Sequence, residues 1–172
     1  MWARSSVFFA LVLAVQPPAP KVLSRGPVAV YEQACARCHG PNGSFYGPDL
    51  GKGKTDPQLY KAVQDMADNQ GQIELSSVEV EAQTAYHRAI IKREPFLAIT
   101  GRTKTELRGE MTSKASIVVT VAGNPQKVRT ERFTWIATLT GTGPICVTAK
   151  LKNTETRLDP DKASHSHSEP KH

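Results

Sequence analysis

The sequence is poor in cysteine and in aromatic residues. Three cysteines and 6% aromatic residues stand in a chain of 172 residues. Three cysteines are too few for a disulfide scaffold, and few aromatic rings leave little large apolar surface for a core. A domain shorter than about 80 residues usually needs an added staple, such as a bound group. We therefore expect one or two small domains, with a bound group completing at least one core.

A hydrophobic run long enough to cross a membrane is also missing. The apolar run at residues 7–15 follows Arg4 and is nine residues long, whereas a membrane-spanning helix needs about 20. This pattern is typical of a secretory signal peptide, so we assign residues 1–20 to a signal peptide and linker. Because residues 16–20 contain no clean cleavage motif, an uncleaved anchor stays open. We expect a periplasmic or otherwise exported protein that contacts a membrane only through this segment.

The chain has no acidic excess, since its formal net charge is +6. Most of the excess of Lys and Arg over Asp and Glu lies after Arg93. Such a charge would attract an acidic protein partner or an anionic surface, although a plain solvated surface explains it equally well. No nucleic-acid partner is expected.

Three segments in the first half carry helix signals. Pro27 suits the first turn of a helix that runs into the first two cysteines. A second helix is expected to begin at Thr55 or Asp56 and to end at Asn69 and Gly71, with apolar residues at every third or fourth position. A third begins with Ser76 or Ser77 as its cap and Glu79 as a partial capping box, and Pro95 ends it. Its predicted apolar face includes Ala85, Tyr86 and Ala89.

After residue 95 the apolar pattern changes to a period of two. A β-branched run occupies residues 117–121, and alternating segments occupy residues 133–139 and 145–149, separated by Gly and Pro turns. Short strands at this spacing predict a small β-sandwich over residues 96–158. Cys146 is out of phase with its apolar neighbours and is predicted to face away from the core. Either a small sheet residue or a thiol that pairs between chains would fit there.

The C-terminal residues 159–172 have a strongly polar composition. We predict a disordered tail, because such a segment cannot bury enough apolar surface to fold. Its histidines, His165, His167 and His172, could bind a metal weakly or simply belong to a polar tail.

The most informative motif is the CxxCH sequence made by Cys35, Cys38 and His39. Two thiols at this spacing can form thioether bonds to the two vinyl groups of one haem, and the imidazole that follows reaches the iron from the same side. A thioredoxin-like redox pair would need a βαβ context, and a structural zinc site would need four ligands. A disulfide would not account for His39. We therefore expect one covalently bound haem c.

Around this motif the chain resembles the monohaem class I c-type cytochromes. The resemblance covers residues 26–94 and implies a cytochrome c haem domain whose first and last helices cross near Tyr31 and Tyr86. Residues 96–158 faintly resemble bacterial immunoglobulin-like accessory domains. The expected fold class is therefore mixed, α then β, with a small all-α cytochrome c domain followed by a small immunoglobulin-like β-sandwich. The resemblance to the cytochromes rests on Tyr31, the CxxCH motif, Gly40, Gly43, the sequence Gly47-Pro48-Asp49-Leu50, a later Met and Tyr86.

The resemblance also implies the roles of the site residues. Cys35 and Cys38 anchor the haem, His39 is the proximal iron ligand and Met66 is the distal one. The Pro48 carbonyl accepts a hydrogen bond from the His39 ring, which would fix the ring and raise its basicity. Met66 also completes an apolar helical stripe, so core packing is an alternative role for it.

Other distal ligands stay open, namely His87, which we expect to face solvent, Met111 in the β part, or none. His/Met ligation favours electron transfer over catalysis, so we expect no enzyme but an electron-transfer protein, or an electron-transfer subunit of a larger oxidoreductase. An open distal site would instead indicate a haem enzyme or a gas or redox sensor. A third hypothesis makes the β part a binding module with an accessory haem. The cations Arg37, Lys52 and Lys54 could line the haem edge where a redox partner binds, or form an ordinary solvated face.

Overall fold

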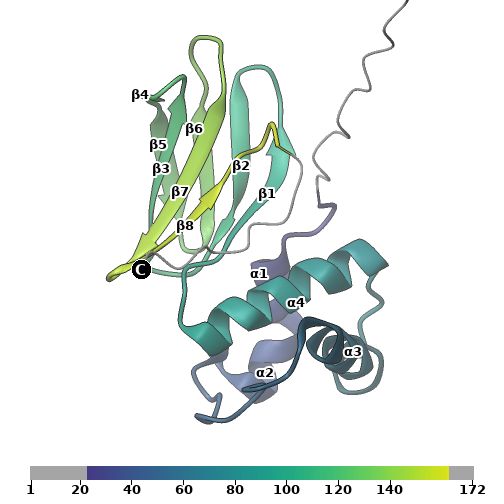
Figure 1. Cartoon of the computed structure of the whole chain (residues 1–172). Coiled ribbons are helices and arrows are strands. Elements are labelled where there is room, and N and C mark those ends of the chain that lie inside the picture. The colour runs from purple at the N-terminus through teal and green to yellow at the C-terminus, as the bar shows by residue number, and fades with distance from the viewer. Residues whose placement is uncertain (1–22, 163–172) are drawn as a thin grey trace, which may run out of the picture.

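The computed structural model describes residues 23–162. The predicted signal peptide and linker at residues 1–20 lie outside the described residues, as do residues 163–172 of the predicted tail with its three histidines. Helices lie at one end of the described part and two β-sheets at the other (Figure 1). None of the helices within residues 23–162 is long and apolar enough to cross a membrane.

The helical part is built from short elements. Among the helices of the described residues, only α3 and α4 are longer than five residues. The first helix of the sequence prediction is divided, because a π-helical turn separates α1 from α2. In chain order the elements are α1 (Pro27–Val30), η1 (Tyr31–Cys35), α2 (Ala36–His39), η2 (Pro41–Gly43), α3 (Asp56–Met66), η3 (Ala67–Gly71) and α4 (Ser77–Lys92).

The two longer helices begin where the sequence predicts. The Thr55 hydroxyl accepts a hydrogen bond from the Gln58 N–H, and the Gln58 side chain accepts one from the Thr55 N–H. Ser76 and Glu79 form the same reciprocal pair at the start of α4. Each capping box satisfies two N–H groups that have no partner inside the helix. Both predicted helix starts are confirmed.

The buried face of α4 includes polar residues that the apolar pattern does not predict. Tyr86 and Ala89 are buried as expected, whereas Ala85 is exposed and Gln83 and His87 are buried. The Gln83 side-chain amide donates a hydrogen bond to the Pro27 carbonyl at 2.6 Å. This bond satisfies the amide nitrogen of Gln83 inside the fold.

Residues 97–158 contain two four-stranded antiparallel sheets, with the orders β1-β2-β6-β5 and β4-β3-β7-β8. Buried residues of both sheets pack into one core around Trp135. The predicted strands at residues 117–121, 133–139 and 145–149 are confirmed as β3, β6 and β7. The strands are β1 (Leu97–Arg102), β2 (Glu106–Met111), β3 (Ser116–Val121), β4 (Asn124–Pro125), β5 (Lys127–Glu131), β6 (Thr134–Thr138), β7 (Ile145–Leu151) and β8 (Thr154–Leu158).

The predicted fold class is wrong in its helical part. A small all-α cytochrome c domain would bury its helices around a core of its own. Instead, Val28, Tyr31 and Tyr86 pack in one cluster with Phe96 and Ala98, which belong to the chain entering β1 and to β1 itself. The helices are therefore short elements that share a core with the sheets. Of the predicted immunoglobulin-like β-sandwich, the structure supports two packed antiparallel sheets and no closer assignment.

A buried carboxylate joins the sheets to the first helix. Oε2 of Glu110, on β2, accepts hydrogen bonds from the N–H groups of Val28 at 2.7 Å and of Ala29 at 3.2 Å. Burial raises the pKa of Glu110, while the two amide bonds act in the opposite direction. A Cβ atom on Gly26 would lie 2.0 Å from this carboxyl group, so a side chain at residue 26 would push the carboxylate away from α1.

The tail prediction is wrong at its start, because residues 159–162 are attached to the sheets. Oδ2 of Asp161 accepts a hydrogen bond from the Ile145 N–H at 3.1 Å. Its other carboxylate oxygen pairs with Arg102 at 2.8 Å. Ile145 lies on β7 and Arg102 lies on β1. Because both are far from the tail in the sequence, the polar composition of the tail does not predict these contacts.

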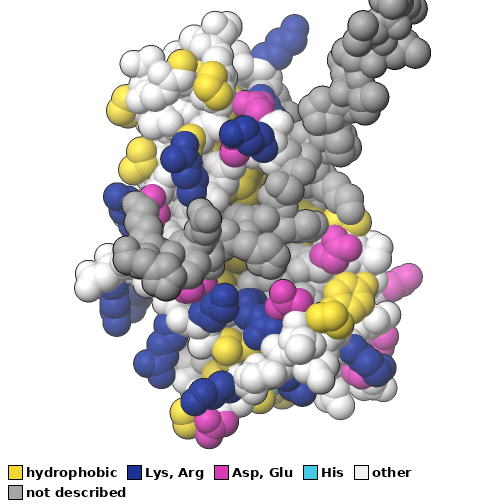
Figure 2. Space-filling model, in the orientation of Figure 1, with side chains coloured by type: hydrophobic (Ala, Val, Ile, Leu, Met, Phe, Trp, Pro, Cys, Tyr) yellow, Lys and Arg dark blue, Asp and Glu magenta, His cyan; other side chains and the backbone are white. Residues whose placement is uncertain are grey.

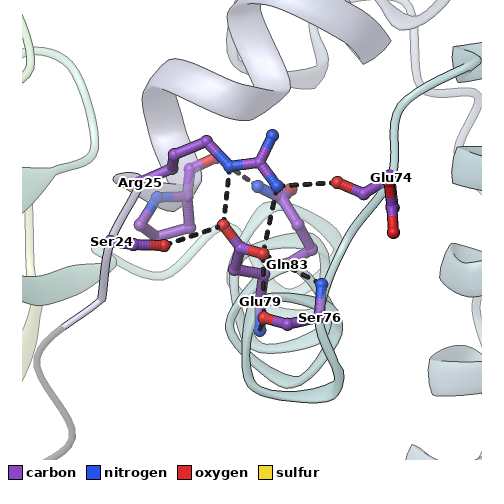
Figure 3. Close-up of polar contacts among 7 residues, drawn as sticks. Ser24, Arg25, Glu74, Ser76, Glu79 and Gln83 are labelled. Carbon is purple, nitrogen blue, oxygen red and sulfur yellow. Dashed lines mark hydrogen bonds and ion pairs between the residues drawn. The ribbon is translucent and has the colours of Figure 1, made fainter.

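An ion pair connects the segment before α1 to the start of α4 (Figure 3). Nε and Nη2 of Arg25 donate to the two carboxylate oxygens of Glu79 at 2.7 and 3.0 Å. Nη2 also donates to the Glu74 carbonyl at 2.6 Å, and Ser76 adds hydrogen bonds to Glu79. The Arg25 guanidinium is the main reason why the pKa of Glu79 falls to about 2.

We expect acid to weaken the fold through this carboxylate. The pKa of Glu79 in the folded chain lies below the usual value of 4.5. Glu79 therefore stabilises the fold fully when the pH is above 4.5, and this contribution is lost as the pH falls toward about 2. Urea unfolding at about pH 6 and about pH 3 should therefore show a smaller pH dependence for Glu79→Gln than for the wild type. Asp65→Asn, which changes an exposed pair with Lys61, is the control. Equal pH dependence in wild type and Glu79→Gln would contradict the assignment.

Candidate functional site

The CxxCH motif lies where α2 ends. Cys35 is half-buried and Cys38 is exposed, and both are free thiols. His39 is the last residue of α2, and Gly40 ends the helix with a φ of 73°. A Cβ atom on Gly40 would lie 2.9 Å from the backbone nitrogen of Phe45, so only glycine fits this tight turn. The turn leaves the imidazole and both thiols together at one end of the helical part.

The imidazole of His39 is available as a ligand. Its ring packs edge-on against Tyr46, with the ring centroids 5.0 Å apart. Burial lowers the pKa of His39, so the ring is neutral at neutral pH, and a neutral imidazole is the form that binds metals. No hydrogen bond engages its ring nitrogens within the described part of the chain.

The donor atoms of the motif suit a haem better than a bare metal ion. No group of three or more His, Cys, Asp and Glu side chains within residues 23–162 is placed to hold a metal ion. Cys35, Cys38 and His39 therefore do not converge on one point. In a c-type haem only the imidazole meets the iron, whereas the two sulfurs bond to the edge of the macrocycle.

Exposed apolar side chains lie in the loop that follows the motif. Phe45 is 71% exposed and Leu50 is 45% exposed. Large apolar side chains left in water usually mark a contact surface, and a haem is a broad apolar plate that could cover them. The free thiols, the imidazole and these exposed side chains are the groups of the described part that a covalently bound haem would contact.

The contact predicted between Pro48 and His39 is not formed. Pro48 is exposed in a turn, and the hydrogen bonds described for residues 23–162 include none between its carbonyl and the His39 ring. The carbonyl that lies close to the first helix is that of Gly40, which accepts from the Tyr31 hydroxyl at 3.2 Å. The role of Pro48 as a partner of His39 therefore stays a prediction.

The two methionines considered as distal ligands lie in different places. Met66 is half-buried and packs against the cluster of Leu59, Val63 and Val80, so it has the core contacts that its apolar stripe indicated. Met111 is 2% exposed and belongs to the core between the two sheets, which removes it as a ligand. Met66 as the distal ligand stays a prediction.

The expectation that His87 faces solvent is wrong. Its side chain is 3% exposed, and its Nδ1 is hydrogen-bonded to the Tyr46 hydroxyl. Desolvation, with a smaller effect of His39, lowers the pKa of His87 to about 4, so the ring is neutral at physiological pH. Its ring centroid lies 6.4 Å from that of His39.

The helical elements around the motif are in contact through two tyrosines. Tyr31 and Tyr86 meet edge-on with centroids 5.2 Å apart, which is the contact that the resemblance implies. Tyr46 is a member of the site that the sequence pattern did not indicate. It lies in a polar loop, and its partner His87 is 41 residues away in the chain, so no local periodicity connects the two.

Two surface hollows lie near the helices, and neither is lined by the CxxCH residues. One, of about 630 Å³, is lined by Lys52, Lys54 and Lys61 beside the start of α3. The other, of about 530 Å³, lies between α3, α4 and the sheets. Arg37 is exposed, and its guanidinium donates to the Gln70 carbonyl at 3.3 Å. In the view of Figure 2, Lys and Arg side chains lie over both the sheets and the helices, with Asp and Glu side chains among them.

No family model, no curated protein and no solved structure matches the chain. The resemblance to c-type cytochromes therefore rests on the residues around the CxxCH motif alone.

Proposed function

We propose that the chain is an exported electron-transfer protein, or an electron-transfer subunit of a larger oxidoreductase, with one covalently bound haem c. One observation carries the proposal. At the end of α2, two free thiols and a neutral imidazole occur in CxxCH spacing, and no described residue is hydrogen-bonded to the imidazole nitrogens. The bound haem would supply a reversible one-electron couple. Export accords with attachment of haem to CxxCH outside the cytosol and depends on the predicted signal at residues 1–20.

Each residue of the site has a defined task in this proposal. Cys35 and Cys38 hold the macrocycle in place and His39 supplies the proximal nitrogen. Phe45 and Leu50, now exposed, would pack against the macrocycle and keep water from it. Met66 would supply the distal thioether, which favours reduced iron and raises the reduction potential. The partner would be a redox protein, and the net charge of +6 favours one with an acidic surface.

A direct test is expression of the full chain together with a cytochrome c maturation system. The purified protein should be coloured, and its haem should stay with the polypeptide in acid acetone, because thioether bonds survive that extraction. The alkaline pyridine spectrum should be that of a haem with both vinyl groups saturated. Colourless protein from cells that mature a control cytochrome c would refute the proposal.

One observation favours a second candidate, a haem enzyme or gas sensor with an open distal site. Met66 packs on the apolar cluster of α3 and α4, and a residue held there would need to move to reach iron. The Met66→Ala variant distinguishes the two candidates. If Met66 is the ligand, the variant loses the far-red thioether-to-ferric band and its ferrous form binds carbon monoxide at least about ten times faster, as expected when an internal ligand worth about 1.4 kcal/mol or more is removed.

The control for this comparison is Leu59→Ala, which truncates a buried residue of the same apolar cluster. It should destabilise the protein without changing the far-red band. A wild-type protein that lacks the band and binds carbon monoxide rapidly would exclude Met66 and favour the open site.

A further inference from the structure

We infer that the hydrogen-bonded pair of Tyr46 and His87 orients the proximal imidazole of His39, in the place that the Pro48 carbonyl was expected to fill. This inference rests on the proposed haem site and names two positioning residues for it. It concerns side chains from the loop after α2 and from α4, the helix that runs across the end of the sheets in Figure 1.

The contacts around Tyr46 lead back to the turn that ends α2. The Tyr46 hydroxyl is hydrogen-bonded to Nδ1 of His87, and the His87 ring packs edge-on against Tyr31 with centroids 5.3 Å apart. The Tyr31 hydroxyl donates to the Gly40 carbonyl at 3.2 Å. These contacts form a series from Tyr46 through His87 and Tyr31 to Gly40.

The hydrogen bond to His87 anchors the hydroxyl end of Tyr46. His87 is 3% exposed and Tyr31 is fully buried, so bulk water cannot take the place of either side chain in the series. A ring anchored in this way is a firm surface for whatever packs against it.

What packs against Tyr46 is the imidazole of His39. The two rings meet edge-on, with centroids 5.0 Å apart and an angle of 76° between their planes, which is the favoured arrangement of aromatic pairs. With no hydrogen bond from the described residues to hold its ring, His39 depends on this contact for its orientation. Groups behind an iron ligand control its orientation and the electronic properties of the metal.

The rings of His39, Tyr46 and His87 form one cluster. The centroids are 5.0 Å apart for His39 and Tyr46, 5.9 Å for Tyr46 and His87, and 6.4 Å for His39 and His87. Tyr31 also contacts His87, with centroids 5.3 Å apart. A positioning role for His87 and a role as second iron ligand are distinguished by the spin state of the ferric protein that lacks His87.

The test compares proton NMR spectra of the ferric haem protein, because the haem methyl shifts depend on the orientation of the axial imidazole plane. Tyr46→Phe keeps the ring and removes the hydroxyl, and His87→Phe keeps a ring and removes the hydrogen-bond partner of that hydroxyl. Both should retain full haem content and change the order of the methyl resonances in the same way. The double variant should change it no further, since both substitutions break one interaction.

Tyr60→Phe is the matched control, because Tyr60 is a half-buried tyrosine of α3 that contributes nothing to the series. Its methyl pattern should equal that of the wild type. Unchanged patterns in Tyr46→Phe and His87→Phe would overturn the inference while leaving the haem in place. A high-spin spectrum in His87→Phe would overturn it in favour of His87 as an iron ligand. Haem-free wild-type protein would instead refute the proposed function, and this inference with it.

Discussion

Replacing both Cys35 and Cys38 by alanine is expected to abolish covalent haem attachment. The two sulfurs are the only anchors that the proposed site offers, and Cys38 is already exposed and free to react. A chain without them could hold haem only through the bonds from His39 and Met66 to the iron, which acid acetone breaks. Haem stain on a denaturing gel should therefore fall to background in the double variant.

The single variants and a third cysteine provide the controls. Cys35→Ala and Cys38→Ala each leave one thioether, so the haem should stay attached and its pyridine spectrum should shift toward that of a haem with one free vinyl group. Cys146, on β7, is a half-buried free thiol outside the motif. Cys146→Ala should retain the full haem content of the wild type. Haem that survives extraction from the double variant would contradict attachment through the CxxCH motif.

Local signals in the sequence predicted the starts of the helices and the strands of the sheets. The capping boxes at Thr55 and Ser76 each depend on a residue three positions away, and such short patterns can be read directly. Alternation likewise identified β6, in which Trp135 and Ala137 are buried and Thr134 and Thr138 are exposed. Alternation alone predicts that a strand is present and which of its side chains are buried, because one face of each sheet is buried.

The errors concern polar groups whose partners lie far away in the chain. Gln83 bonds to a carbonyl 56 residues earlier, and Glu110 accepts from an amide 82 residues earlier. Apolar periodicity treats both as surface residues, so it placed Ala85 rather than Gln83 on the buried face of α4 and missed the carboxylate that joins the sheets to α1. The same limit explains the fold class. A motif of five residues predicts the chemistry at the end of α2 but contains no information on what packs behind it.

Replacing Trp135 by alanine is expected to cost about 3–5 kcal/mol of unfolding free energy. The indole is 1% exposed and lies at the centre of the core between the sheets. A Cβ atom on Gly109 would lie 2.5 Å from the ring, so the neighbouring backbone is in contact with the indole and cannot easily close the cavity left by alanine. Urea unfolding followed by circular dichroism should show a lower midpoint with an unchanged slope. Val118→Ala, at a residue that is 46% exposed on β3, should change the free energy by no more than about 0.5 kcal/mol.

The effect of Trp135→Ala should also reach the haem site. The indole N–H donates to the Glu110 carbonyl at 3.3 Å, and the carboxylate of the same residue holds the first amides of α1, which leads through η1 into the CxxCH motif. Loss of the indole removes a hydrogen-bond donor from Glu110 on β2, and the carboxylate of Glu110 positions the first helix. Haem content per mole of purified Trp135→Ala should therefore fall below that of Val118→Ala. Full haem content together with the predicted loss of stability would show that the helices keep their fold without the sheets, contrary to the core that the two parts share.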